Sequence, residues 1–397
     1  MLSQLLDNQP KYRLDQIYRA WFTPGVSSYF EITTLPKDLR EKLKGEPWMV
    51  AKEKTMQISK IDGTKKVLLE LSDGACIETV LMGRENKKLT READERYTIC
   101  ISTQVGCPMG CTFCATGKMG FKRNLTMQEI VDQVRFWQQY LSNCHPERNE
   151  PKANGVEGSD KQRNLDSSTA LAFARSAQND KRISNIVLMG QGEPLLNYEN
   201  VKAALNIILK YTEMGPRQIT VSTVGVPTVM EKMVVDKDWP PVRFALSLHN
   251  PIEEERKKLI PSHQKDFLKF LIEWSKKYHE RFSSRTQFIG MEYTIVPGEN
   301  DSEKHLKALI KLASKLGKVR INLIPLNTPA TCHPRESGDP RNDMADSRLR
   351  GNDIVGETTI DHWHKRLMKC GFTTTIRRSQ GQDIAAACGQ LALNTVE

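Results

Sequence analysis

The stretch CISTQVGCPMGCTFCATG, residues 100–117, contains four of the nine cysteines of the chain. Three of them, Cys107, Cys111 and Cys114, have the spacing C-x-x-x-C-x-x-C, and the aromatic residue Phe113 precedes the last. In a large chain with an odd number of cysteines, such thiols favour metal or redox chemistry over a disulfide framework. Structural zinc takes a closed set of four ligands, whereas three thiolates suit an iron–sulfur cluster with one open iron. The spacing therefore favours a cluster, with a zinc site completed by a distant fourth ligand as the alternative.

Alternating strand and helix patterns begin just before this stretch. YTICIS (97–102) predicts a strand, and TMQEIVDQVRFWQQYL (126–141) predicts a helix that Thr126 and Glu129 begin as a capping box. The alternation continues through the apolar runs NIVLM, ITVS, FALSL, MEYTIV and VRINLIPL, and FTTTIRR closes it. Six β–α units in succession predict an α/β fold with a partial (β/α)6 barrel over residues 97–397. Such barrels carry their reactive residues at the C-terminal ends of the strands.

Two shorter regions precede the barrel. Residues 1–50 show helical periodicity interrupted by the turn signal Thr23-Pro24-Gly25, which predicts a small N-terminal helical domain. Residues 51–96 hold β-favouring runs punctuated by Asp62-Gly63 and Asp73-Gly74, which predict a short meander of hairpins as a linker. Two polar segments, at about 143–180 and 331–353, interrupt the barrel pattern. We interpret them as solvated inserts in loops rather than as metal sites built on Cys144 or Cys332.

The charge balance bears on the partner of the protein. Lys and Arg outnumber Asp and Glu by 58 to 48, which gives a net charge of +10 and favours a polyanion such as nucleic acid. The first residues, MLSQLLDNQPKYRLD, lack the apolar run of a signal peptide, and no stretch approaches the roughly 18 apolar residues of a membrane span. We therefore expect a cytoplasmic monomer with no membrane partner.

Polar groups follow several of the predicted strands. Each alone also fits a turn or a helix cap, but their shared place at one rim of the barrel favours a ligand site. Such groups would hold a nucleoside and an amino-acid moiety by hydrogen bonds. They are Gly192, Glu193, Ser222, Ser247, Leu248, His249 and Asn327.

The cysteine motif resembles that of the radical S-adenosylmethionine (SAM) superfamily, in which three thiolates hold a 4Fe–4S cluster and the fourth iron binds SAM. Further stretches resemble one family within it, which methylates carbon 2 of adenine in 23S rRNA, at the peptidyl transferase centre, and in tRNA, beside the anticodon. The resemblance runs from about Gln57 to the end, apart from the inserts. The matching stretches are GACIETV, CPMGCTFC, MGQGEPLLN, VSTVGVP, ALSLHNP, INLIPLN, GFTTTIRR and AACGQLA.

This resemblance implies one cluster per chain, two SAM molecules per turnover and an electron donor of flavodoxin type. It implies that Cys107, Cys111 and Cys114 bind the cluster and that the polar residues at the rim bind SAM. The alternatives are the sister family that methylates adenine at carbon 8 of the same rRNA region, and a non-catalytic zinc-dependent RNA-binding module.

The resemblance also assigns three catalytic roles. Carbon 2 of adenine is not a nucleophile, so a radical route is required. Cys388 is implied to carry the methyl group, Cys100 to release the RNA by forming a disulfide with Cys388, and Glu78 to accept the carbon 2 proton. Taken alone, the two cysteines also fit inert core positions and Glu78 a solvated side chain. Phosphate contacts are expected from basic residues of the N-terminal domain, namely Lys11, Arg13, Arg19, Lys37, Arg40, Lys42 and Lys44.

Overall fold

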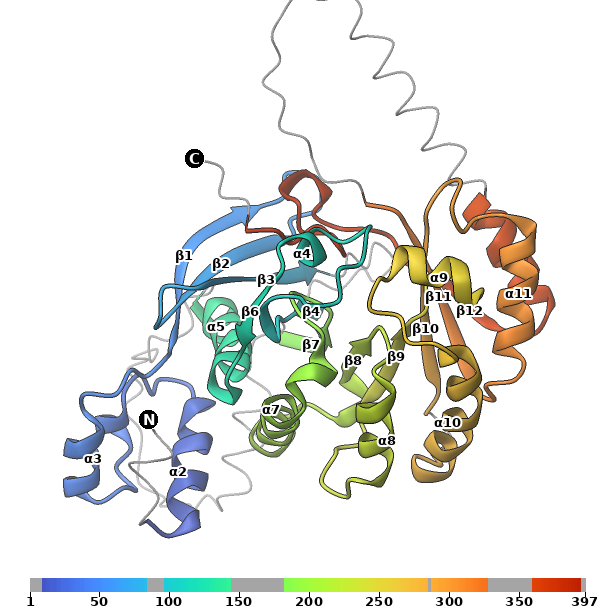
Figure 1. The fold of residues 1–397 in the computed structure, drawn as a ribbon. Helices are drawn as coiled ribbons and strands as arrows, with labels where there is room; N and C mark the ends of the chain where they lie inside the picture. The colour runs from blue at the N-terminus through green and yellow to red at the C-terminus, as the bar shows by residue number, and fades with distance from the viewer. Residues whose placement is uncertain (1–8, 84–95, 144–181, 285–286, 328–358, 394–397) are drawn as a thin grey trace, which may run out of the picture.

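The computed structural model describes residues 9–83, 96–143, 182–284, 287–327 and 359–393 (Figure 1). Apart from Asn143, the two predicted inserts lie outside these residues. The central element is one ten-stranded sheet, in the spatial order β1-β2-β3-β4-β7-β8-β9-β10-β11-β12.

The second part of this sheet is parallel throughout. Its strands follow one another in the chain and in space, so that Ile99 pairs with Ile186 and Ser222 with Ala245. The sheet ends at β12 in the described residues, and the predicted α/β fold with a partial barrel is confirmed. The parallel strands are β4 (Arg96–Cys100), β7 (Arg182–Leu188), β8 (Ile219–Thr223), β9 (Arg243–Ser247), β10 (Ile289–Ile295), β11 (Val319–Pro325) and β12 (Thr373–Ile376).

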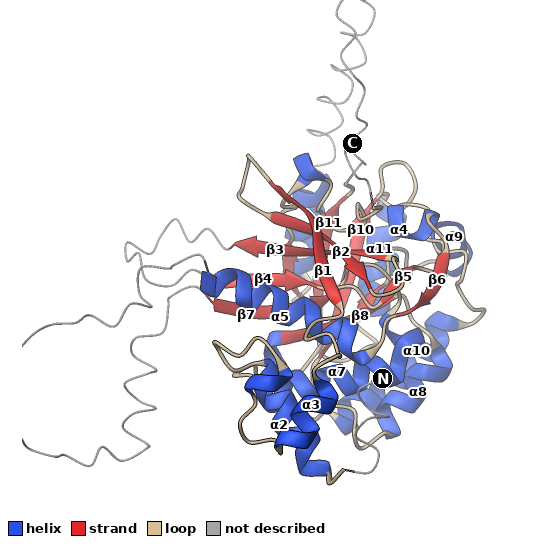
Figure 2. Cartoon of the chain, turned by 90° about the vertical axis from the view of Figure 1, so that its left-hand side faces the viewer, coloured by secondary structure: helices blue, strands red, loops and turns tan. Residues whose placement is uncertain are grey.

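Amphipathic helices cover the outer face of the parallel strands (Figures 1 and 2). Trp137, Trp274 and Trp363 are fully buried in the core between helices and sheet. The predicted capping box is present, since the Thr126 N–H donates to Glu129 Oε2 (2.8 Å) and the Glu129 N–H to Thr126 Oγ1 (3.2 Å). The helices are α5 (Met127–Asn143), α7 (Tyr198–Tyr211), α8 (Pro227–Val235), α10 (Phe267–Arg281), α11 (Glu303–Ala313) and a further one at 359–369, with short turns η3 (Pro194–Asn197) and η4 (Pro216–Gln218).

The predicted meander continues the sheet of the barrel. Strands β1 (Ala51–Ile58), β2 (Lys65–Leu71) and β3 (Cys76–Gly83) are antiparallel, and β3 pairs with β4 so that Val80 lies opposite Cys100. The residues expected to form a linker therefore add three strands beside the first barrel strand.

The N-terminal helices pack against α5 through a buried arginine. The guanidinium of Arg135 lies 4.9 Å from the ring centre of Trp21 and 4.8 Å from that of Trp48. It also donates to the Trp48 carbonyl (2.9 Å), while Asp132 accepts from the Val50 N–H (2.7 Å). The elements of this region are α2 (Lys11–Trp21), η1 (Tyr29–Glu31) and α3 (Lys37–Leu43).

A small hairpin, β5 (Gln104–Gly106) with β6 (Phe121–Asn124), frames the cysteine loop and includes the short helix α4 (Ala115–Lys118) in its connection. Helix α9 (Glu253–Leu259) lies near this loop in Figure 1, and the C-terminal segment 380–393, with η5 (Gln382–Ile384), crosses the top of the sheet. None of the helices in the described ranges is long and apolar enough to cross a membrane.

Candidate functional site

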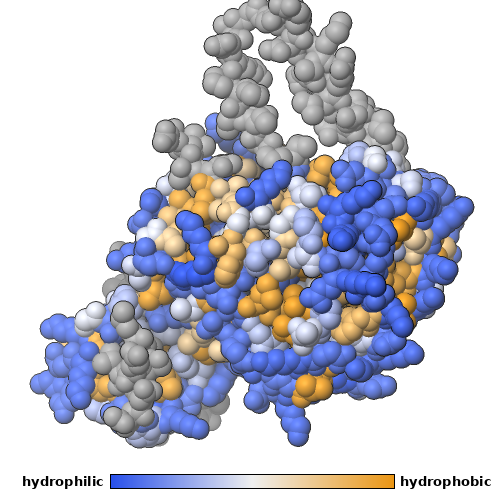
Figure 3. All heavy atoms as spheres, viewed as in Figure 1, coloured by the Kyte–Doolittle hydropathy of each residue, from blue (hydrophilic) through white to orange (hydrophobic). Residues whose placement is uncertain are grey.

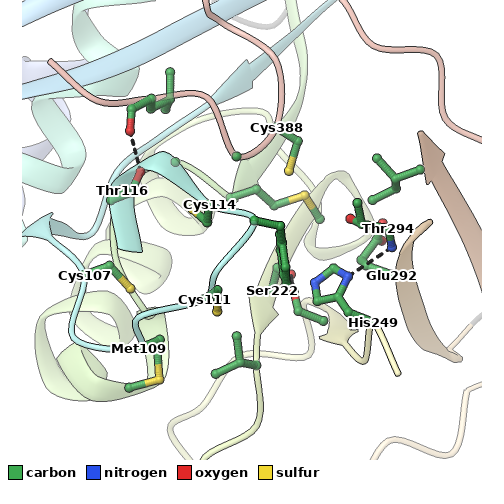
Figure 4. A pocket seen from close by; sticks show the side chains of 18 of the residues that line it. Cys107, Met109, Cys111, Cys114, Thr116, Ser222, His249, Glu292, Thr294 and Cys388 are labelled. Carbon is green, nitrogen blue, oxygen red and sulfur yellow. Dashed lines mark hydrogen bonds between the residues drawn. The ribbon is translucent and has the colours of Figure 1, made fainter. Parts of the chain in front are cut away.

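A cavity opens at the C-terminal ends of the parallel strands (Figure 4). Its wall brings together side chains that are far apart in the sequence, as the barrel pattern predicts. Of the predicted residues, Leu248, Cys100 and Glu78 lie outside the lining. Those that line it are Cys107, Cys111, Cys114, Gly192, Glu193, Ser222, Ser247, His249, Asn327 and Cys388.

The cysteine loop is wound tightly by glycines. Gly106 has a φ of +76°, and a Cβ there would lie 1.9 Å from the Gly120 carbonyl oxygen, so only glycine fits. The Cys107 N–H donates to the same oxygen (2.8 Å), which closes the loop. In Figure 4 the three cysteine side chains come from this one loop.

Two thiols of this loop, those of Cys107 and Cys111, need a positive centre nearby in order to ionise. Burial raises the pKa of Cys107 to about 12 and raises that of Cys111 further. A metal cluster would deprotonate them outright, because a coordinating thiol binds as the thiolate. In the described ranges no three His, Cys, Asp or Glu side chains converge on a point that could hold a single metal ion. The soft donor set on one cavity wall fits a 4Fe–4S cluster with an open iron.

Glu193 is held in a fixed orientation beyond the end of β7. Its Oε1 accepts from the Leu195 N–H (3.0 Å) and its Oε2 from the Val224 N–H (2.9 Å). Burial raises the pKa of this carboxyl to about 7, although the two N–H groups favour its ionised form. The preceding Gly192 has a φ of +106°, and its missing side chain lets the chain approach the β5 strand closely. Glu193 therefore presents an oriented carboxyl that ionises near neutral pH.

The next two strand ends supply neutral polar groups. The hydroxyls of Ser222 and Ser247 lie 3.2 Å apart. His249 has a φ of 54°, and its Nδ1 accepts from the Thr294 N–H (3.0 Å), which leaves the proton of the neutral ring on Nε2. Burial lowers the pKa of His249 to about 3, so this imidazole is uncharged at neutral pH. Phe113 packs against its ring at 4.6 Å between centres.

The sequence reasoning missed a polar cluster on the last strands. Glu292 Oε1 accepts from Asn322 Nδ2 (2.7 Å), while its Oε2 lies 3.9 Å from Arg377 and accepts no hydrogen bond from any described residue. Burial raises the pKa of the Glu292 carboxyl. A glutamate inside the apolar run MEYTIV is the one signal that would have indicated it. Nothing in the sequence indicates Arg377 as its partner.

Cys388 lies in the C-terminal segment, with its thiol exposed to the cavity. Its carbonyl accepts from Asn327 Nδ2 (3.1 Å), and the next carbonyl, of Gly389, accepts from the Ala115 N–H (2.7 Å). The cavity wall shields this thiol from bulk water, and that loss of hydration raises the pKa of Cys388, whereas the guanidinium of Arg377 opposes the effect. Asn327 thus fixes the backbone that carries the thiol.

Cys100 lies on the inner face of β4, whereas its neighbours Ile99 and Ile101 face the helices. It packs with Val80 and Ala386, which places it beside the segment that carries Cys388. Burial raises the pKa of Cys100 to about 12, and the Cys388 thiol adds to that effect.

Glu78 is buried, so the alternative of a solvated side chain is wrong. Its Oε1 lies 2.9 Å from the ammonium of Lys66, which is buried too, and its Oε2 accepts from the Leu393 N–H (3.2 Å). The sequence could not show this environment, because it depends on the pairing of β2 with β3 and on the fold of the C-terminal segment.

Comparison with known proteins shows to which family this chain belongs. Residues 101–310 match the Radical SAM superfamily. The dual-specificity RNA methyltransferase RlmN of Marinobacter nauticus is 32% identical over 385 residues, which cover 96% of this chain and 87% of that protein. A "Probable dual-specificity RNA methyltransferase RlmN" of Thermus thermophilus is 37% identical, with 96% of this chain and 89% of that protein covered. The chain belongs to the RlmN family.

A solved structure agrees with this membership. A radical SAM methyltransferase from Sphaerobacter thermophilus is 30% identical, covers 98% of this chain and 96% of its own, and superposes with a TM-score of 0.69. The predicted family and enzyme class are confirmed: this RlmN-family enzyme methylates RNA by radical SAM chemistry. Membership in the superfamily implies a 4Fe–4S cluster and SAM.

Proposed function

We propose that this RlmN-family enzyme methylates carbon 2 of adenosine in 23S rRNA, at the peptidyl transferase centre, and in tRNA, beside the anticodon. The observation that carries this proposal is the single cavity that unites three cluster-type thiols with Cys388, the thiol implied as methyl carrier. A sulfur carrier beside a radical source suits a ring carbon that cannot attack a sulfonium itself.

The cofactor side of the cavity would be organised by its strand ends. Cys107, Cys111 and Cys114 would hold one 4Fe–4S cluster per chain, whose role when bound is to cleave SAM reductively to a 5'-deoxyadenosyl radical. The Glu193 carboxylate would accept hydrogen bonds from the amino group of SAM. The neutral hydroxyls of Ser222 and Ser247 and the imidazole of His249 would orient the rest of SAM without adding charge. Asn327 would also face SAM from the cavity wall, whereas Leu248, which lies outside the lining, would contribute only through its backbone.

Cys388 would act twice in each turnover. Its sulfur would first attack the methyl carbon of one SAM molecule, so that a sulfur–carbon bond forms, S-adenosylhomocysteine leaves, and the thiol proton is lost. The methyl on Cys388 would then lose a hydrogen atom to the radical derived from a second SAM molecule, and the carbon radical left on the Cys388 sulfur would bond to carbon 2 of the adenine. Two SAM molecules are therefore consumed per methyl delivered, and the RNA is transiently linked to the enzyme.

Cys100 and Glu78 would complete the reaction. The Cys100 thiolate would attack the Cys388 sulfur, so that a disulfide forms and the carbon–sulfur electron pair stays with the carbon, which takes up a proton to become the new methyl group. The one unpaired electron left by the radical addition would return to the electron-transfer chain that supplied it. Glu78 would accept the carbon 2 proton, as the resemblance implies. Because Glu78 lies behind Leu393 and outside the cavity lining, it would act only after the C-terminal segment shifts.

RNA binding would use the basic N-terminal helices. The side chains of Lys11, Arg19 and Lys42 are exposed there, and most of the visible surface of these helices is hydrophilic in Figure 3. The division into a helical domain (1–50), a β region (51–96) and a barrel (97–397) is part of this proposal, as are a monomeric state and a flavodoxin-type electron donor. Arg13 and Arg40 also donate hydrogen bonds to neighbouring carbonyls, so their contribution to RNA binding would be smaller.

The test begins with metal and nucleoside analysis. Protein purified without oxygen should be brown and contain about four iron atoms per chain. Incubation with SAM, a reductant and RNA should give 2-methyladenosine in both rRNA and tRNA fragments. Stoichiometric zinc without iron would support the non-catalytic alternative, and 8-methyladenosine would support the sister activity.

A further inference from the structure

The segment that carries Cys388 has an irregular backbone. Gly381 (φ 67°), Ala385 (φ 49°) and Gly389 (φ 83°) all lie in the left-handed region, and η5 is the one regular element between 380 and 393. The two glycines adopt this conformation without strain, but Ala385 keeps it only where contacts with its surroundings fix it. The contacts of this segment therefore decide where the Cys388 thiol lies.

The turn between β1 and β2 supplies the contacts before Cys388. Asp383 Oδ1 accepts from Ser59 Oγ (2.7 Å), and its Oδ2 accepts from the Lys60 N–H (3.0 Å). The Gly381 N–H donates to Asp62 Oδ2 (2.8 Å). A Cβ on Gly381 would lie 2.9 Å from Thr64 Cγ2, so the turn and the segment are in close contact.

The turn is itself rigid. Ser59 Oγ accepts from the N–H groups of Ile61 and Asp62 (3.2 Å each), and Asp62 Oδ1 accepts from the Thr64 N–H (3.0 Å). The groups that this turn offers to the C-terminal segment are thus held in place by hydrogen bonds within the turn.

The cysteine loop supplies the contacts after Cys388. The Ala115 N–H donates to the Gly389 carbonyl (2.7 Å), and Thr116 Oγ1 donates to the Leu391 carbonyl (2.6 Å). These residues follow Cys114 directly in helix α4. Cys388 is therefore held between the cysteine loop on one side and the β1–β2 turn on the other.

We propose that the β1–β2 turn positions Cys388 for methyl transfer: Ser59, through Asp383, keeps the Cys388 thiol at the place in the cavity where it receives the methyl group, and the contact of Asp62 with Gly381 holds the start of the same segment. This inference rests on the proposed role of Cys388 as carrier. Displacement at the methyl carbon needs the attacking sulfur about 3–3.5 Å away and aligned with the bond that breaks, and a misplacement of about 1 Å costs on the order of 100-fold in rate. Releasing the turn from the segment should therefore slow methylation of Cys388 and leave SAM binding intact.

The test uses the reconstituted full-length enzyme with Ser59→Ala and Asp383→Ala, and the conservative Asp383→Asn. A single turnover with SAM is followed by mass spectrometry of the Cys388 peptide, and SAM affinity and iron content are measured in parallel. Asp383→Ala should methylate Cys388 about 30- to 100-fold more slowly, with SAM affinity and iron within about twofold of wild type. Asp383→Asn keeps an acceptor for Ser59, so its rate of Cys388 methylation should lie between those of Asp383→Ala and wild type.

Glu70→Ala is the matched control, because Glu70 lies in the same β region and forms an exposed ion pair with Lys54, away from the C-terminal segment. It should methylate Cys388 at the wild-type rate. A wild-type rate in both Ser59→Ala and Asp383→Ala would overturn the proposal, as would a loss of iron or SAM binding equal to the loss of rate.

A second measurement separates this proposal from the proposed function. If the wild-type enzyme gains no methyl on Cys388, the carrier role fails, and the turn is then tested by mild oxidation of the same holoenzymes. Slower Cys100–Cys388 disulfide formation in Asp383→Ala than in wild type and Glu70→Ala would still support positioning of Cys388 by the turn. Equal rates in all three proteins would contradict it.

Discussion

The raised pKa of Glu193 leads us to predict that the affinity of the enzyme for SAM depends on pH. Its side chain is 2% exposed, and burial raises its pKa to about 7. The ionised carboxylate can accept a hydrogen bond from the amino group of SAM at either oxygen, beside the backbone donors it already has, whereas protonation removes one oxygen as an acceptor. With a pKa near 7, about 90% of the group is ionised at pH 8 and about 10% at pH 6. The apparent affinity for SAM should therefore fall over this range, by at most about tenfold if SAM binds only the ionised form.

Isothermal titration calorimetry under anaerobic conditions measures this dependence, with wild type and Glu193→Gln compared from pH 6 to pH 8. The glutamine does not titrate, so the variant should bind SAM more weakly than wild type at pH 8 and lack the additional fall at lower pH. The amino group of SAM titrates equally in both experiments, and the difference between the two profiles therefore reports Glu193 alone. Parallel profiles for the two proteins would refute the assignment of Glu193.

The same raised pKa affects folding stability. The folded-state pKa lies above the ordinary value of 4.5, so the unfolded chain loses this proton first as the pH rises. The contribution of Glu193 to stability is therefore fully present below about pH 4.5 and is lost by about pH 7, a loss of roughly 3 kcal/mol. Unfolding of the metal-free protein should show this slope in wild type and lack it in Glu193→Gln.

Three further predictions concern the thiols and the buried ion pair. Cys100→Ala should still methylate Cys388 but stall afterwards, leaving a protein–RNA adduct on denaturing gels; clean turnover by this variant would remove Cys100 from the reaction. In wild type, release of the RNA should accelerate about tenfold per pH unit between roughly pH 7 and pH 9, because the pKa of Cys100 is raised to about 12 and the thiolate fraction limits the attack; a flat single-turnover profile would argue against attack by this thiolate. Lys66→Met should lower the free energy of unfolding by about 3–5 kcal/mol, because it leaves the Glu78 carboxylate buried without its cation. Urea unfolding should show that loss, and the double variant that also carries Glu78→Gln should recover much of it. An equal loss in the double variant would contradict this explanation.

The periodicity of the sequence predicted the barrel well, because its helices and strands are long and regular. It also predicted that the residues proposed to bind SAM would lie together, since parallel strands that share one edge must place the residues that follow them side by side. The cysteine spacing singled out, without any tertiary information, the loop that we propose to hold the cluster.

The remaining features could not be predicted, because they depend on contacts between residues that are far apart in the sequence. The hairpins of β1–β3 were expected from their turn signals, but their edge-to-edge pairing with β4 depends on Val80 lying opposite Cys100, which no local pattern encodes. The same applies to Glu78, whose burial depends on Lys66 from the neighbouring strand. Arg135 resembles any surface arginine of an amphipathic helix until Trp21 and Trp48 cover it.

The most direct test of the methyl-cysteine route follows the hydrogens of the methyl group. The enzyme is incubated without oxygen with a reductant, RNA and SAM that carries a trideuterated methyl group, and the nucleosides are analysed by mass spectrometry. The route through Cys388 predicts 2-methyladenosine with two deuterium atoms in its new methyl group, because one deuterium is abstracted while the group is on the cysteine sulfur. A methyl group that arrives with all three deuterium atoms would contradict that route.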